Sequence, residues 1–140
     1  MTKIRYVQKQ DRDFWFRLDR HIAPLEFDKK VRDQTGYVLL EDQVPVGLLR
    51  YHLLWDSVPF CAMLFVDGPH QGKGYGKSLM GFWEADMRAQ GFHAVMTSTR
   101  ADETAQHFYR KLGYRDCGGL LLDAIESGQP LELFFAKAMG

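Results

Sequence analysis

A glycine-rich segment that follows an apolar run limits the folds open to this chain more than any other feature. The run at 60–66 has the length and flanks of a buried strand, and an amphipathic helix is expected to begin near Gly76. Between them, Gly72, Gly74 and Gly76 leave every second position without a side chain. Consecutive backbone amides can therefore converge beside the positive end of a helix, which is an arrangement that binds phosphate. The segment predicts a strand, an anion-binding loop and a helix.

The spacing of these glycines distinguishes between the known kinds of phosphate-binding loop. A dinucleotide-binding loop needs Gly-x-Gly-x-x-Gly, and here the third glycine comes one residue early. Gly76-Lys77-Ser78 matches the end of the nucleoside-triphosphate loop Gly-x-x-x-x-Gly-Lys-Ser/Thr, but Gln71 stands where its first glycine should be. A P-loop-like nucleotide-binding protein that responds to ATP or GTP with magnesium is therefore a remote alternative. The remaining pattern is Gln-x-x-Gly-x-Gly, from Gln71 to Gly76.

A second pattern lies in the segment 102–114. Ala105, Tyr109, Gly113 and Tyr114 fit Asn-x-x-Ala-x-x-x-Tyr-x-x-x-Gly-Phe/Tyr, with Asp102 in place of the asparagine. Together, the two patterns resemble the GNAT superfamily of N-acetyltransferases, whose cofactor signature is Arg/Gln-x-x-Gly-x-Gly/Ala. The resemblance covers nearly the whole chain and is weakest before Gly36.

The order of expected elements is also that of the family. Hydrophobic periodicity and turn residues predict strands at 3–8, 37–41, 46–55, 60–66, 92–98, 114–123 and 130–138. Helices are expected from Asp11 or Asp13 to a close or kink at Pro24, at 26–34 with Gly36 as its end, from about Gly76 to Gly91, and at 102–112. The resemblance implies an α/β fold (α+β in some schemes) with a mixed, mostly antiparallel central sheet of about seven strands and four helices.

The resemblance also implies a ligand and a role for each matching residue. The loop amides would hold the pyrophosphate of acetyl-coenzyme A, the pantetheine arm would lie along the end of the strand at 60–66, and the Tyr109 hydroxyl would protonate the departing thiolate. Tyr109 also shares the apolar face of its helix with Ala105 and Leu112, so a core position is the alternative. The implied cofactor-binding residues are Leu64, Phe65, Val66, Gln71, Gly72, Lys73, Gly74, Tyr75, Gly76, Lys77, Ser78 and Asp102.

The expected reaction is direct attack of a primary amine on the thioester in a ternary complex. The attacking amine must be neutral, and a positioned general base contributes about 10²–10⁴-fold. The usual glutamate of the cofactor-facing strand is missing, because 60–66 contains no acid. Candidate bases, acting directly or through water, are Asp67, His70, Asp102, Glu103, Asp123 and Glu132. Two alternatives are catalysis by orientation alone, which can supply about 7–11 kcal/mol, and a non-catalytic acyl-coenzyme A-binding or sensor module.

Composition bears on the binding partners and the cellular location of the protein. With 140 residues and 46% hydrophobic content, the chain is expected to form a single domain over 1–140. Lys plus Arg (18) balance Asp plus Glu (18), so no net field favours nucleic acid or a membrane surface. Cys61 and Cys117 stand far apart, so neither a disulfide nor a metal site is expected. No signal peptide or membrane-spanning run is evident, which predicts a cytoplasmic protein. The resemblance implies a small-molecule or peptide amine as acceptor. A monomer or a homodimer is expected, since the apolar runs at 120–122 and 131–135 could pair across a dimer.

Overall fold

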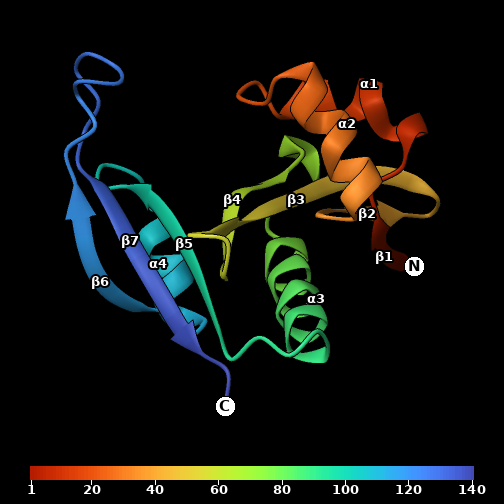
Figure 1. Ribbon diagram of the computed structural model, residues 1–140. Coiled ribbons are helices and arrows are strands. Elements are labelled where there is room, and N and C mark those ends of the chain that lie inside the picture. The colour runs from red at the N-terminus through yellow and green to blue at the C-terminus, as the bar shows by residue number, and fades with distance from the viewer. The chain divides into compact units, whose positions relative to one another are not determined.

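The computed structural model describes residues 1–140, and its elements follow the predicted order (Figure 1). The strands are β1 (Thr2–Tyr6), β2 (Gly36–Glu41), β3 (Val44–Leu54), β4 (Val58–Val66), β5 (Ala94–Arg100), β6 (Arg115–Leu120) and β7 (Glu132–Ala138). The helices are α1 (Arg12–Leu18), α2 (Pro24–Asp33), α3 (Tyr75–Ala89) and α4 (Ala105–Lys111), and short 3-10 turns lie at η1 (Lys9–Asp11) and η2 (Gly68–His70).

The strands form one mixed sheet in the order β1-β2-β3-β4-β5-β7-β6. β4 pairs with β5 in parallel, whereas β1 with β2, β2 with β3, β5 with β7 and β6 with β7 pair antiparallel. The 7-stranded mixed sheet confirms the predicted fold class. By compactness the chain divides into two units, the first made of residues 1–52 and 62–86 and the second of 53–61 and 87–140.

In the first unit, different helices pack against the two faces of β2 and β3. Successive side chains of a strand point to opposite faces, so Val38 and Leu48 join Trp15 of α1 and Phe27 of α2 in one buried cluster. Tyr37, one position before Val38, instead contacts Phe82 of α3, with ring centroids 5.6 Å apart. Figure 1 shows α1 and α2 on one side of these strands and α3 on the other.

Tyrosine hydroxyls join α3 to β1 and β2. Tyr6 and Tyr37 donate hydrogen bonds to the same Asp86 oxygen, Oδ2, at 2.8 and 2.6 Å, and their rings stack at 5.5 Å. Tyr37 is fully buried. Burial and the hydrogen bond to Asp86 raise the pKa of Tyr37 above its ordinary value of 10.0.

Tyr37→Phe is expected to lower the free energy of unfolding at pH 7 by about 1.5–3 kcal/mol, because it removes a hydrogen bond to a charged group. In the wild type, the raised pKa of Tyr37 means that the folded state holds a proton that the unfolded state loses above pH 10. This contribution to stability is therefore complete below pH 10 and is lost as the pH rises further. Urea unfolding at pH 7 and at about pH 10.5 should show a smaller alkaline loss in the variant, and equal losses would contradict the prediction.

The second unit pairs β5, β7 and β6 and places α4 against β5. Val95, Thr97 and Thr99 are buried at alternate positions of β5. Tyr109 of α4 contacts Phe135 of β7 with ring centroids 6.0 Å apart. The first half of β4 belongs to this unit and pairs with β5 in parallel, as the predicted strand-helix-strand unit requires.

The predicted boundaries of the first helices are wrong. α1 ends at Leu18, because Asp19 takes an extended conformation (φ −99°, ψ 101°), so no helix continues from Asp11 or Asp13 to Pro24. Pro24 begins α2 instead of closing α1, which fits proline at a first helical position, where no amide hydrogen bond is lost. Gln34, with φ 57°, ends α2.

Gly36 is needed for packing at the start of β2 and does not end α2. A Cβ at Gly36 would lie 3.0 Å from Val7 and 3.2 Å from Trp15. The turn between the strands predicted at 37–41 and 46–55 is also tighter than expected, since Asp42 (φ 49°) and Gln43 (φ 74°) complete it and β3 begins at Val44. α4 begins at Ala105, later than the predicted 102. No helix in the structure combines the length and the hydropathy of a bilayer-spanning segment.

Candidate functional site

The glycine-rich loop lies between β4 and α3 and takes a backbone conformation that requires glycine. Gly72 and Gly74 have φ of 82° and 81°, in the left-handed region that other residues rarely adopt. An added Cβ at either position would meet nothing within 4 Å. The glycines are therefore required by the path of the backbone and not by crowding.

The backbone amides of this loop have no acceptor in the protein. No main-chain or side-chain oxygen accepts a hydrogen bond from the amides of residues 72–77, and the next amide, that of Ser78, donates to the Gly74 carbonyl at 3.0 Å. The first amides of a helix have no intrahelical acceptor, and α3, with 15 residues, adds the positive end of its dipole. These donors suit an anion with several oxygens.

Two side chains of the predicted motif hold the loop in shape. Gln71 donates from Nε2 to the Val66 carbonyl at 2.8 Å, which ties the loop back to the end of β4. Ser78 donates from Oγ to the Gly74 carbonyl at 3.1 Å. Position 71 needs a long side chain that carries a hydrogen-bond donor, because this side chain must reach across the turn. The side chains of Gln71 and Ser78, two of the predicted site residues, thus bind main-chain carbonyls, and so do their amides, which donate to Gly68 at 3.2 Å and to Gly74 at 3.0 Å.

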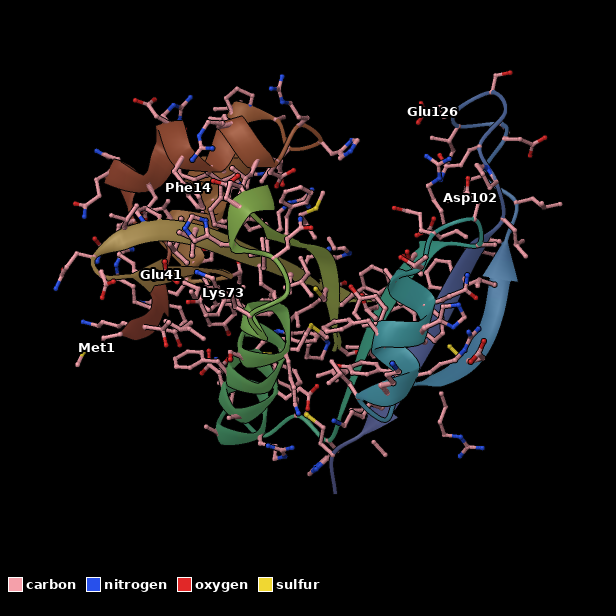
Figure 2. The ribbon with its side chains drawn as sticks, turned by 180° about the vertical axis from the view of Figure 1, so that it is seen from behind. Met1, Phe14, Glu41, Lys73, Asp102 and Glu126 are labelled. Atoms are coloured by element: carbon pink, nitrogen blue, oxygen red, sulfur yellow. The ribbon has the colours of Figure 1, made fainter.

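Two further loop side chains, Lys73 and Tyr75, converge on a residue that sequence reasoning missed. Glu41, the last residue of β2, accepts a hydrogen bond from the Tyr75 hydroxyl and pairs with Lys73 Nζ at 3.2 Å. Figure 2 shows Glu41 and Lys73 close together. His70 Nε2 lies 3.5 Å from the other oxygen of this carboxylate. Nothing near Glu41 in the sequence marks it, because the contacts join residues more than thirty positions apart.

The end of β4 leads directly into this loop within the first unit. Leu64 and Val66 are half-buried, and Phe65 is 40% exposed. The amide of Asp67 donates to the Val46 carbonyl of β3 at 2.8 Å, so the strand pairing extends as far as the loop. The structure therefore places the predicted residues 64–66 and 71–78 together, as one strand end and the loop that follows it.

Tyr109, the predicted acid, lies on α4 in the second unit. It is 6% exposed, and its ring contacts Tyr114 and Phe135 at 5.9 and 6.0 Å between centroids. Burial and the neighbouring Cys61 raise the pKa of Tyr109 above 10.0, against a hydrogen bond with the Thr97 side chain that lowers it. The ring thus belongs to the core, as the alternative interpretation expected, while the hydroxyl is placed beside polar groups.

The candidate bases have different surroundings. Several of them already have partners: Asp67 pairs with Arg17 at 3.3 Å, Asp102 with Arg100 at 3.0 Å, and Glu132 accepts a hydrogen bond from Ser98 at 2.7 Å. His70 approaches Glu41, whereas Glu103 and Asp123 are exposed. Asp102, also predicted to bind the cofactor, precedes α4 in the second unit, and its carboxylate binds the Arg100 guanidinium through two hydrogen bonds.

Solved structures share this architecture along nearly the whole chain. Ard1 from Thermoplasma volcanium gives a TM-score of 0.87 at 18% identity, over 99% of this chain and 98% of that one. A proposed streptothricin acetyltransferase from Bacillus anthracis, in complex with acetyl coenzyme A, gives 0.82 at 15% identity over 99% of both chains. Naa50 from Arabidopsis thaliana, in complex with the bisubstrate analogue CoA-Ac-MVNAL, gives 0.79 at 14% identity over 98% of both. At these identities the similarity shows the fold.

Sequence comparison identifies the family. No curated protein matches the chain. The model of the acetyltransferase (GNAT) family matches residues 4–114. This interval contains the loop at 71–78, the end of β4 and the whole segment 102–114, so it includes every residue that carried the resemblance. The chain belongs to the acetyltransferase (GNAT) family.

Proposed function

We propose that the protein is an N-acetyltransferase that moves the acetyl group of acetyl-coenzyme A to a primary amine. The observation that carries this proposal is the row of amides at 72–77 that lacks any protein acceptor at the start of α3. A diphosphate offers several charged acceptors to such a row, and charge-assisted hydrogen bonds are the stronger kind. Family membership supports acetyl-coenzyme A as the molecule that carries the diphosphate.

The proposed site gives each set of residues a distinct task. When bound, acetyl-coenzyme A supplies an activated acetyl thioester. The amides of the loop, with Gln71 and Ser78 holding its shape, anchor the diphosphate. The main chain of Leu64, Phe65 and Val66 provides a strand end along which the pantetheine arm can lie. Tyr109 donates its hydroxyl proton toward the leaving sulfur, and the raised pKa keeps that proton in place at neutral pH.

The acceptor amine is expected to attack directly, without an acyl-enzyme. Cys61 is 2% exposed inside the paired part of β4, which makes it a poor nucleophile. No carboxylate lies on β4, so the amine must lose its proton to water or to a residue outside this strand. Orientation of the two substrates can itself contribute about 7–11 kcal/mol, so a strand carboxylate is not required for turnover. The structure of Naa50 in complex with the bisubstrate analogue CoA-Ac-MVNAL supports a peptide amine as one acceptor class to test.

Binding of an acyl-coenzyme A without turnover is the second candidate function. The observation in its favour is the same absence of an acid from β4.

Two measurements decide between acetyl transfer and binding without turnover. Calorimetry with coenzyme A, compared with ATP and magnesium, tests the ligand. Mass spectrometry of a mixture of amines and peptides with acetyl-coenzyme A tests turnover. Heat with coenzyme A and acetylated products support the enzyme, whereas heat without products supports the binding module, and heat only with ATP rejects both.

Gly74→Val should raise the Kd of coenzyme A at least about tenfold, because a β-branched residue is strained at positive φ and the amides of the loop would turn away from their common point. Gly128→Val is the matched control. Gly128 has φ 79°, and, as at Gly74, nothing lies within 4 Å of an added Cβ. Both variants carry the same backbone strain, so a similar fall in coenzyme A affinity in the control would contradict the assignment of the loop.

A further inference from the structure

Glu41 is the one acid that contacts the side chains of the anion-binding loop. It ends β2 in the first unit, and its side chain is 22% exposed. The same oxygen, Oε2, accepts the hydrogen bond from the Tyr75 hydroxyl and lies 3.2 Å from Lys73 Nζ. Lys73 Nζ also lies 6.0 Å from the centre of the Tyr75 ring. The carboxylate, the ammonium and the phenol thus form one cluster.

The cluster lies on both sides of Gly74. Lys73 precedes this glycine, and Tyr75, which follows it, is the first residue of α3. Glycine has the largest conformational freedom to lose when a chain becomes ordered, and this loop contains Gly72, Gly74 and Gly76. Holding the side chains before and after Gly74 restricts the peptide groups between them, which belong to the row of amides without acceptors.

We propose that Glu41 is a positioning residue that fixes the loop at 72–77 in the conformation that binds the diphosphate of coenzyme A. The inference rests on the proposed function. Glu41 does not bind the ligand itself. It acts through Lys73 and Tyr75, and it lowers the entropy that the loop must lose when the diphosphate binds.

The charges of the cluster are consistent with this role. A carboxylate close to a diphosphate would weaken binding if it were unpaired, and the Lys73 ammonium compensates the Glu41 charge. The hydrogen bond from Tyr75 and then that from Lys73 lower the pKa of Glu41, so it is ionised at neutral pH. The hydrogen bond to Glu41 raises the pKa of Tyr75, so this hydroxyl keeps the proton that it donates. The cluster therefore persists through the neutral range.

The test compares Glu41→Ala and Glu41→Gln with the wild type. Calorimetry should show the Kd of coenzyme A raised about tenfold in Glu41→Ala, because the side chains of Lys73 and Tyr75 are both released. The Kd should rise less in Glu41→Gln, whose amide oxygen can still accept the hydrogen bond from Tyr75. Glu26→Ala is the control, because Glu26 pairs with Lys29 at 2.8 Å on α2 in the same unit. It should leave the affinity unchanged.

A second measurement separates positioning from general stability. Acetyl-pantetheine carries the thioester but no diphosphate, so Glu41→Ala should lower kcat/KM for acetyl-coenzyme A about tenfold and leave kcat/KM for acetyl-pantetheine near the wild-type value. Equal losses with both donors, or an unchanged or tighter Kd for coenzyme A, would overturn the inference while wild-type binding still supports the proposed function. Failure of the wild type itself to bind coenzyme A would overturn both. If Glu41→Ala does not fold, Glu41→Gln carries the same comparison.

Discussion

Tyr109→Phe is expected to lower kcat for acetyl transfer about 10²–10³-fold while the Kd of coenzyme A stays close to the wild-type value. This is the range found when one hydrogen-bond donor to a developing negative charge is removed from an enzyme. Phenylalanine keeps the ring that packs against Tyr114 and Phe135, so the fold should not change.

The direction of the pKa shift indicates how the Tyr109 hydroxyl works. A cysteine thiol has a pKa of about 8.5, and burial raises the pKa of Tyr109 above 10.0. Full transfer of the proton to the sulfur would therefore be uphill, so in the proposed reaction the hydroxyl would stabilise the charge chiefly as a hydrogen-bond donor. Since Tyr109 stays protonated below its raised pKa, loss of this proton should not reduce the rate between pH 7 and pH 10, where a growing fraction of the amine is neutral.

Tyr114→Phe is the control for this experiment. Tyr114 is buried beside Tyr109, and its ring is 5.9 Å away, so the control removes a hydroxyl from the same aromatic cluster. Steady-state kinetics should show a large loss only for Tyr109→Phe. An unchanged kcat in Tyr109→Phe, or equal losses in the two variants, would assign Tyr109 to the core alone.

Local patterns predicted the parts of the site that lie close together in the sequence. The strand, the glycine loop and the start of α3 occupy consecutive residues, so Gln71, Gly72 and Gly74 could be identified by their spacing alone. The structure adds the reasons for that spacing, since positive φ requires Gly72 and Gly74 and the reach to the Val66 carbonyl requires Gln71. The order of such local segments agreed with that of the family, and the resemblance implied the fold class.

Residues that act through tertiary contacts could not be found in this way. Glu41 contacts Tyr75 and Lys73 only because β2 and the loop meet in the folded chain. The first helix was predicted too long for a related reason. Phe14, Leu18 and Leu25 fit a single helical stripe, but Asp19 is extended, and its buried carboxylate accepts hydrogen bonds from Arg50 and from the His21 amide, which in a continuing helix would donate to a main-chain carbonyl. Tertiary contacts outweigh the local pattern at both places.

Arg50→Met is expected to lower the free energy of unfolding by about 3–5 kcal/mol, because it leaves a buried carboxylate without its partner. Asp19 is 1% exposed, and its Oδ2 lies 2.7 Å from Arg50 Nε. The same oxygen accepts a hydrogen bond from the Trp15 indole at 3.0 Å, and Oδ1 accepts one from the His21 amide at 3.2 Å. Asp19 thus joins the end of α1 and the connection that follows it to β3. A typical domain is stable by only about 5–15 kcal/mol, so the variant should be close to unfolding.

Urea unfolding of two further variants shows whether burial of the charge is the cause. Arg32→Met breaks the Arg32–Asp33 pair, which has a similar separation of 2.8 Å but side chains 69% and 49% exposed, and it should cost about 0–1 kcal/mol. Asp19→Asn combined with Arg50→Met removes both charges, so the double variant should recover part of the stability lost in Arg50→Met, because no unpaired charge remains buried. A loss below about 1 kcal/mol in Arg50→Met, or a double variant less stable than Arg50→Met, would show that the ion pair does not hold the end of α1 in place.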